Sequence, residues 1–104
     1  MTAESDGLTA RQRREIESVF RRVLGGRFQG KVYLFGSRAR GDHRRYSDAD
    51  LLVDADVDER PLRDVRDALA DGGLPFKCDV VLARDVFEPY RGQIEAEKIP
   101  LFEL

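Results

Sequence analysis

The chain has 104 residues, 41% of them hydrophobic and 37% charged, which is one domain's worth of sequence with enough apolar content for a compact core. Its 18 basic and 20 acidic residues give a net charge of -2, so no global basic field exists to coat DNA or RNA, and we expect no stable nucleic-acid binding. The single cysteine, Cys78, excludes an intramolecular disulfide and a multi-cysteine zinc site. The longest apolar runs have four residues, against the ~20 of a membrane helix, and the acidic start lacks the pattern of a signal peptide. We therefore expect a cytoplasmic protein without a membrane partner.

The first periodic segment, residues 9–24, is predicted to be an amphipathic helix. Thr9 and Gln12 have the spacing of a capping box, and Gly25 and Gly26 supply a left-handed stop. The apolar residues that share one helical face are Ile16, Val19, Phe20, Val23 and Leu24.

Strands and helices alternate along the rest of the chain. The predicted strands are Val32–Phe35, Asp48–Val53 and Val80–Ala83, and the predicted helices are Asp58–Ala70 and Phe87–Lys98. This alternation indicates a single α/β or α+β domain over residues 1–104, with a small sheet covered by helices. The apolar C-terminal segment, Ile99–Leu104, either caps its own core or is covered by another chain, and we expect it to cap the core.

Gly36 and Ser37 follow the first predicted strand and form a possible phosphate-binding turn. A glycine allows a close approach of the backbone, so that N–H groups and the Ser37 hydroxyl can contact an anion. A glycine-serine pair is also a common turn, so this feature by itself is weak evidence.

Three aspartates can form a metal site beyond this turn. Asp48 and Asp50 are two residues apart on a predicted strand, so their side chains leave the same face. Asp79 begins a strand that we expect to neighbour theirs. Hard carboxylate oxygens suit Mg²⁺, and two such ions can clamp the attacking and leaving oxygens of a phosphoryl displacement.

The combined pattern resembles a known family. Gly36–Ser37, ten further residues, Asp48-Ala49-Asp50 and then Asp79 are similar to the nucleotidyltransferase superfamily that includes DNA polymerase β, most closely its minimal nucleotidyltransferase branch. The resemblance extends over nearly the whole chain. It implies a three-stranded mixed sheet flanked by about four helices.

The resemblance also implies a role for each site residue. Gly36 and Ser37 match the turn that binds the nucleoside triphosphate, and the aspartates at 48, 50 and 79 match the catalytic residues that hold two Mg²⁺ ions. The third aspartate of the family also helps to deprotonate the acceptor hydroxyl. Arg38 is placed with the nucleotide-binding residues because it follows the turn, although solvent exposure is an equally reasonable role for it.

The biological role is an expectation from the same resemblance. The chain ends soon after the last predicted helix, so we expect the acceptor to be another folded protein. Members of the minimal branch commonly pair with a HEPN-domain toxin and transfer AMP from ATP onto a toxin tyrosine. The alternatives are an antitoxin that neutralises its partner by binding alone, and a transferase that acts on small molecules.

Overall fold

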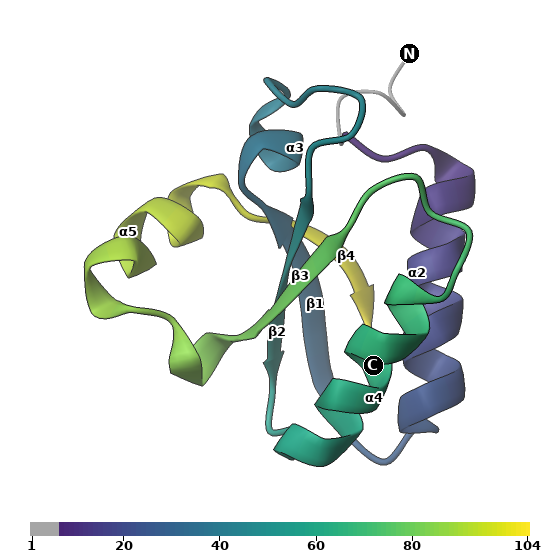
Figure 1. Ribbon diagram of the computed structural model, residues 1–104. Helices are drawn as coiled ribbons and strands as arrows, with labels where there is room; N and C mark the ends of the chain where they lie inside the picture. The colour runs from purple at the N-terminus through teal and green to yellow at the C-terminus, as the bar shows by residue number, and fades with distance from the viewer. Residues whose placement is uncertain (1–6) are drawn as a thin grey trace.

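A four-stranded mixed sheet in the order β3-β2-β1-β4 forms the centre of the computed structural model, which describes residues 7–104 (Figure 1). Strand β1 pairs antiparallel with both β2 and β4, and β2 pairs parallel with β3. The strands are β1 (Gly30–Phe35), β2 (Ala49–Ala55), β3 (Cys78–Leu82) and β4 (Ile99–Glu103). The helices are α2 (Ala10–Leu24), α3 (Ser37–Arg40), α4 (Glu59–Ala70) and α5 (Glu88–Glu97), with a short 3-10 helix η1 (Ala83–Asp85).

The prediction of an α+β fold with a mixed sheet and about four helices is confirmed, except that the sheet has four strands and not three. The additional strand is β4, which pairs with β1 along the outer edge. Pro100 is tolerated there because an edge strand has one side without a ladder partner. The expectation that this segment caps the core is confirmed, since Phe102 packs against the core and its ring meets that of Phe20 edge-on at 5.4 Å between centroids.

Helices α2 and α4 cover one face of the sheet (Figure 1). The capping box at the start of α2 is present, with the Gln12 N–H 3.1 Å from Thr9 Oγ1 and the Thr9 N–H 3.0 Å from Gln12 Oε1. Residues of the sheet that face these helices are fully buried. They include Val32, Leu34, Ala49, Leu51, Val53, Val80 and Leu82.

The opposite side of the sheet is less covered. Helix α5 lies on this side, at a distance from α2 and α4, and has no buried residue (Figure 1). Side chains that alternate with the core residues of β2 and β3, Asp50 and Asp79 among them, therefore point away from the hydrophobic core. Within residues 7–104 no helix has the length and apolar character needed to cross a membrane.

Candidate active site

Asp50 and Asp79 are direct neighbours across the parallel pair of strands β2 and β3. Their side chains share a sheet face, because Ala49 and Leu51 on either side of Asp50 are buried in the core. The two strands are also fixed at their starts, where the Ala49 N–H donates to the Lys77 carbonyl at 2.8 Å. This confirms the expectation that Asp79 begins a strand beside Asp50.

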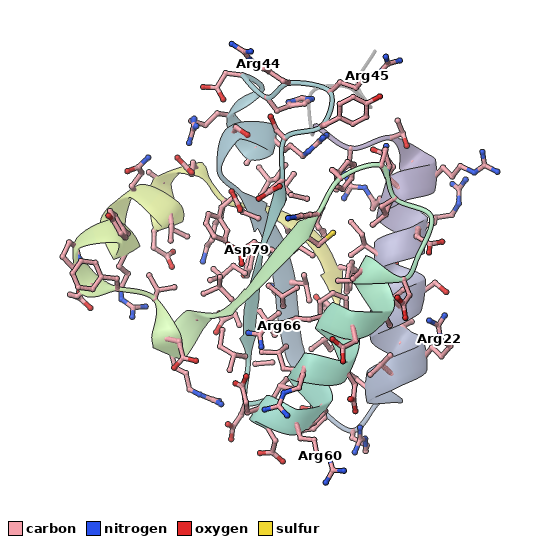
Figure 2. All side chains as sticks on the ribbon, in the orientation of Figure 1. Arg22, Arg44, Arg45, Arg60, Arg66 and Asp79 are labelled. Carbon is pink, nitrogen blue, oxygen red and sulfur yellow. The ribbon has the colours of Figure 1, made fainter. Side chains whose placement is uncertain are left out.

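Asp48 lies two residues before Asp50, at the entry to β2, and is exposed to solvent. Asp79 is likewise exposed, whereas Asp50 is half-buried. Figure 2 shows Asp79 on the central part of the molecule, whereas Arg44 and Arg45 lie at its outer edge, in the loop that precedes β2.

The electrostatic environment of Asp50 is unfavourable for its charged form. Burial, which is the largest cause, and the negative charges of Asp79 and Asp48 together raise the pKa of the Asp50 carboxyl to about 6, with Arg40 acting in the opposite direction. Such crowding of carboxylates is typical of a site that is completed by a cation.

The three aspartates offer the hard oxygen ligands that Mg²⁺ prefers. In the described part of the chain, however, no three acidic, histidine or cysteine side chains converge closely enough to hold one ion between them. Asp50 and Asp79 are nevertheless paired across neighbouring strands, with Asp48 two residues before Asp50. The donor chemistry of the aspartates thus fits a divalent cation.

Gly36 brings the predicted phosphate-binding turn against the same carboxylates. Its backbone has a φ of 79°, in the left-handed region that favours glycine. A Cβ atom at this position would collide with the Asp50 side chain. The turn from β1 into α3, which Gly36 begins, therefore lies directly beside Asp50. A triphosphate-binding turn that works together with the aspartates would need this closeness.

Arg38 has a different environment from the one expected of a nucleotide ligand. Its side chain is buried, with 3% of its surface exposed, and its guanidinium lies 4.0 Å from the centroid of the Phe76 ring. Nη1 donates to the Gly7 carbonyl at 2.7 Å, and Nε and Nη2 donate to the carbonyls of Ser47 and Arg45, each at 2.9 Å. The contacts of Arg38 hold the loop before Asp48 in place, and a phosphate at this guanidinium would have to replace them.

Glu97 belongs to the site although sequence reasoning missed it. Its Oε1 accepts a hydrogen bond from the Gly36 N–H at 2.8 Å, and it lies 3.3 Å from Nη1 of Arg40. Its charge also contributes to the raised pKa of Asp50. No local pattern marks this residue, because it reaches Gly36 from a helix 61 residues further along the chain.

A cavity of about 670 Å³ borders the site beside Asp48. Its walls combine aromatic and basic side chains, including Tyr46, Phe76 and Lys77. Arg66 and Ala70 of α4 and Cys78 of β3 also line it, so the cavity extends toward the side of the sheet that α4 covers.

Comparisons with known proteins identify the family to which the chain is similar. Residues 13–102 match the family model described as a nucleotidyltransferase domain. A solved structure of a candidate minimal nucleotidyltransferase is 31% identical, with a TM-score of 0.67 over 88% of this chain and 90% of that one. No curated protein matches the chain significantly.

Two further solved structures come from toxin-antitoxin systems. One, a toxin-antitoxin with AMP-PNP, is 25% identical and has a TM-score of 0.69, covering 86% of this chain and 72% of that chain. The other, a mutant of the toxin-antitoxin pair MntA-HpeT, has a TM-score of 0.68 at 23% identity over the same shares of the two chains, which is a likeness of fold alone.

Proposed function

The chain belongs to the nucleotidyltransferase domain family and is of the minimal nucleotidyltransferase type. We propose that it is a magnesium-dependent antitoxin, which transfers AMP from ATP to a tyrosine hydroxyl of a HEPN-domain toxin. The observation that carries the proposal is the contact between the Gly36 turn and Asp50, whose strand neighbour is Asp79. The proposal takes this turn as the element that binds the triphosphate and the neighbouring carboxylates as those that nucleotidyl transfer requires.

The nucleotide and the partner are supported by the solved neighbours. The structure described as a toxin-antitoxin with AMP-PNP contains an ATP analogue, and the likeness to it covers 86% of the present chain. An antitoxin role for this chain, with ATP as its substrate, is the simplest reading of that likeness. The HEPN class of the toxin comes from the family resemblance of the motifs.

The proposed transfer forms one bond and breaks another at the α-phosphorus of ATP. The tyrosine oxygen attacks the phosphorus, its proton is removed, and the bond from the α-phosphorus to the bridging oxygen breaks, so that pyrophosphate leaves. Asp79 is the residue that we assign to the acceptor proton, since it is exposed and lies beside Asp50. Gly36 and Ser37 would bind the triphosphate through the backbone and the hydroxyl.

The same residues would bind the metal. Asp48, Asp50 and Asp79 would hold two Mg²⁺ ions, which when bound neutralise charge on the triphosphate and on the departing pyrophosphate. Asp50 depends most on such a cation, because its own carboxylate is half-buried among like charges.

Transfer of AMP to a toxin, followed by mass, tests the proposal directly. The purified protein is mixed with Mg²⁺, ATP and a HEPN-domain toxin from the same genome, and intact mass spectrometry follows the toxin. We expect a mass increase of one or more AMP units on a toxin tyrosine, lost in Asp79→Asn and retained in Asp85→Asn, an aspartate of η1 outside the site. Replacement of the acceptor tyrosine by phenylalanine should abolish the modification.

The alternatives give different outcomes in the same experiment. If the protein neutralises its toxin by binding alone, Asp79→Asn still suppresses toxin activity and no AMP is transferred. Transfer to small hydroxyl compounds with none to the toxin would contradict both antitoxin readings.

A further inference from the structure

The Gly36 N–H and the Arg40 guanidinium already hold an anion, and this anion belongs to the protein itself. The Gly36 N–H donates to Glu97 Oε1 at 2.8 Å, and Nη1 of Arg40 lies 3.3 Å from both carboxylate oxygens of Glu97. The Glu97 side chain is only 13% exposed, compared with 42% for Arg40. The Glu97 carboxylate, at the end of α5, therefore occupies the hydrogen-bond donor that the Gly36 turn offers.

Carboxylate and phosphate oxygens are recognised by the same chemistry. Both accept charge-assisted hydrogen bonds from guanidinium groups and bonds from backbone N–H groups. A triphosphate that enters beside Asp50 would meet the negative charge of Glu97 at the donors it needs. Both anions cannot use the Gly36 N–H and Arg40 at once.

We infer that Glu97 occupies an anion subsite made by Gly36 and Arg40, and that a phosphate group of the nucleotide displaces it. This inference rests on the proposed function, because it requires a nucleotide at this turn. It assigns Arg40 to the phosphate and makes Glu97 a competitor that sets the nucleotide affinity. Arg40 can exchange Glu97 for a phosphate group without losing its other contact, which is an exposed ion pair with Asp42 at 3.2 Å.

Helix α5 can release Glu97 at little structural cost. None of its residues is buried. At its other end, the N-cap residue Phe87 and the helix residue Tyr90 are 65% and 60% exposed. Glu97 is the last residue of the helix, and the backbone of Lys98 is already extended. Rotation of the Glu97 side chain therefore breaks no contact of the hydrophobic core.

Binding of triphosphate to matched variants tests the inference. The dissociation constants of inorganic triphosphate and of ATP are measured by calorimetry, with and without Mg²⁺, for the full chain and for Glu97→Gln. We expect Glu97→Gln to bind both probes roughly three- to tenfold more tightly, because the competing charge is removed while the shape is kept. Glu88→Gln, at the opposite end of α5, is the control for the change in net charge.

Two further variants make the outcome specific. Glu97→Ala removes the acceptor altogether and should tighten binding of triphosphate and ATP at least as much as Glu97→Gln. Arg40→Gln should weaken this binding, both in the natural sequence and in combination with Glu97→Gln. Unchanged or weaker binding in both Glu97 variants would overturn this inference and leave the proposed function in place. If no protein in the set bound ATP or triphosphate under any condition, the proposed function would be contradicted, and the inference with it.

Discussion

Asp50 is the residue at which function and stability are most clearly opposed. Its carboxylate is half-buried on β2 and lies in the field of two other aspartates, so its charged form is disfavoured in the folded protein. In the unfolded chain the same group is fully hydrated. The folded protein therefore gives up stability to keep this charge at the site.

The pH dependence of stability should reveal this cost. The pKa of Asp50 in the folded protein is about 6, above its ordinary value of 3.8, so the folded state binds the proton more tightly. The stability that this proton contributes is present at pH 4 and is lost as the pH rises through 6. Without metal, we expect Asp50→Asn to melt at a higher temperature than the natural sequence at pH 7.5, with the difference shrinking toward pH 4.

Asp54→Asn is the matched control for the loss of one charge, because Asp54 is an exposed residue of the same strand. Differential scanning fluorimetry at several pH values in a chelating buffer provides the measurement. A melting temperature of Asp50→Asn below that of the natural sequence at pH 7.5 would contradict this description of the site.

Some residues of the site could be predicted from sequence because their signal is local. Gly36 and the pair Asp48 and Asp50 are recognisable from their spacing, and the expected closeness of Asp79 is confirmed by the strand register. Glu97 could not be found, because only the tertiary fold brings it to Gly36. The burial of Arg38 also has no sequence signal, since its partners are backbone carbonyls, which every residue possesses.

At the scale of elements, the accuracy of prediction follows the strength of the local signals. Helix α2 was expected from Thr9, where its cap indeed lies, because the capping box and the glycine stop mark both ends. Strand β4 was missed because Pro100 interrupts a short apolar segment. Its strand conformation comes from pairing with β1, which is a tertiary contact.

The loop between α3 and β2 depends on Arg38. The guanidinium bonds carbonyls of Ser47 and Arg45 together with that of Gly7, so one side chain joins the loop to the segment before α2. Lysine keeps the charge but lacks the planar arrangement of several donors. Arg38→Lys should therefore lower the free energy of unfolding by about 2 kcal/mol or more, because the buried Gly7 carbonyl and the partly buried carbonyls of Ser47 and Arg45 lose hydrogen-bond donors.

Urea unfolding followed by circular dichroism measures this loss. Arg45→Lys, an exposed arginine of the same loop, should change the free energy of unfolding by less than about 0.5 kcal/mol. Equal effects of the two substitutions would show that Arg38 does not hold the loop.

At the scale of the molecule, one side of the sheet carries the hydrophobic core and the other side carries the candidate site. Helices α2 and α4 cover one face and enclose the hydrophobic core, whereas α5 lies loosely packed on the other side (Figure 1). The alternation of side chains along β2 and β3 turns Asp50 and Asp79 away from the core, toward that other side. The site is therefore built on rigid strands and bordered by an element that can move without loss of the core. This arrangement suits the proposed transfer from a nucleotide to a protein acceptor.

The central claim is that this face holds a metal-dependent nucleotide site, and thermal melting with ligands tests it most directly. The melting temperature is measured for the natural sequence and for Asp48→Asn, each with Mg²⁺ alone and with Mg²⁺ and excess ATP. A ligand at ~100 times its dissociation constant adds about 2.7 kcal/mol of stability, or roughly 10 °C in a domain of this size. We predict such a shift with Mg²⁺ and ATP for the natural sequence and its loss in Asp48→Asn; no shift in the natural sequence, or an equal shift in both proteins, would contradict the claim.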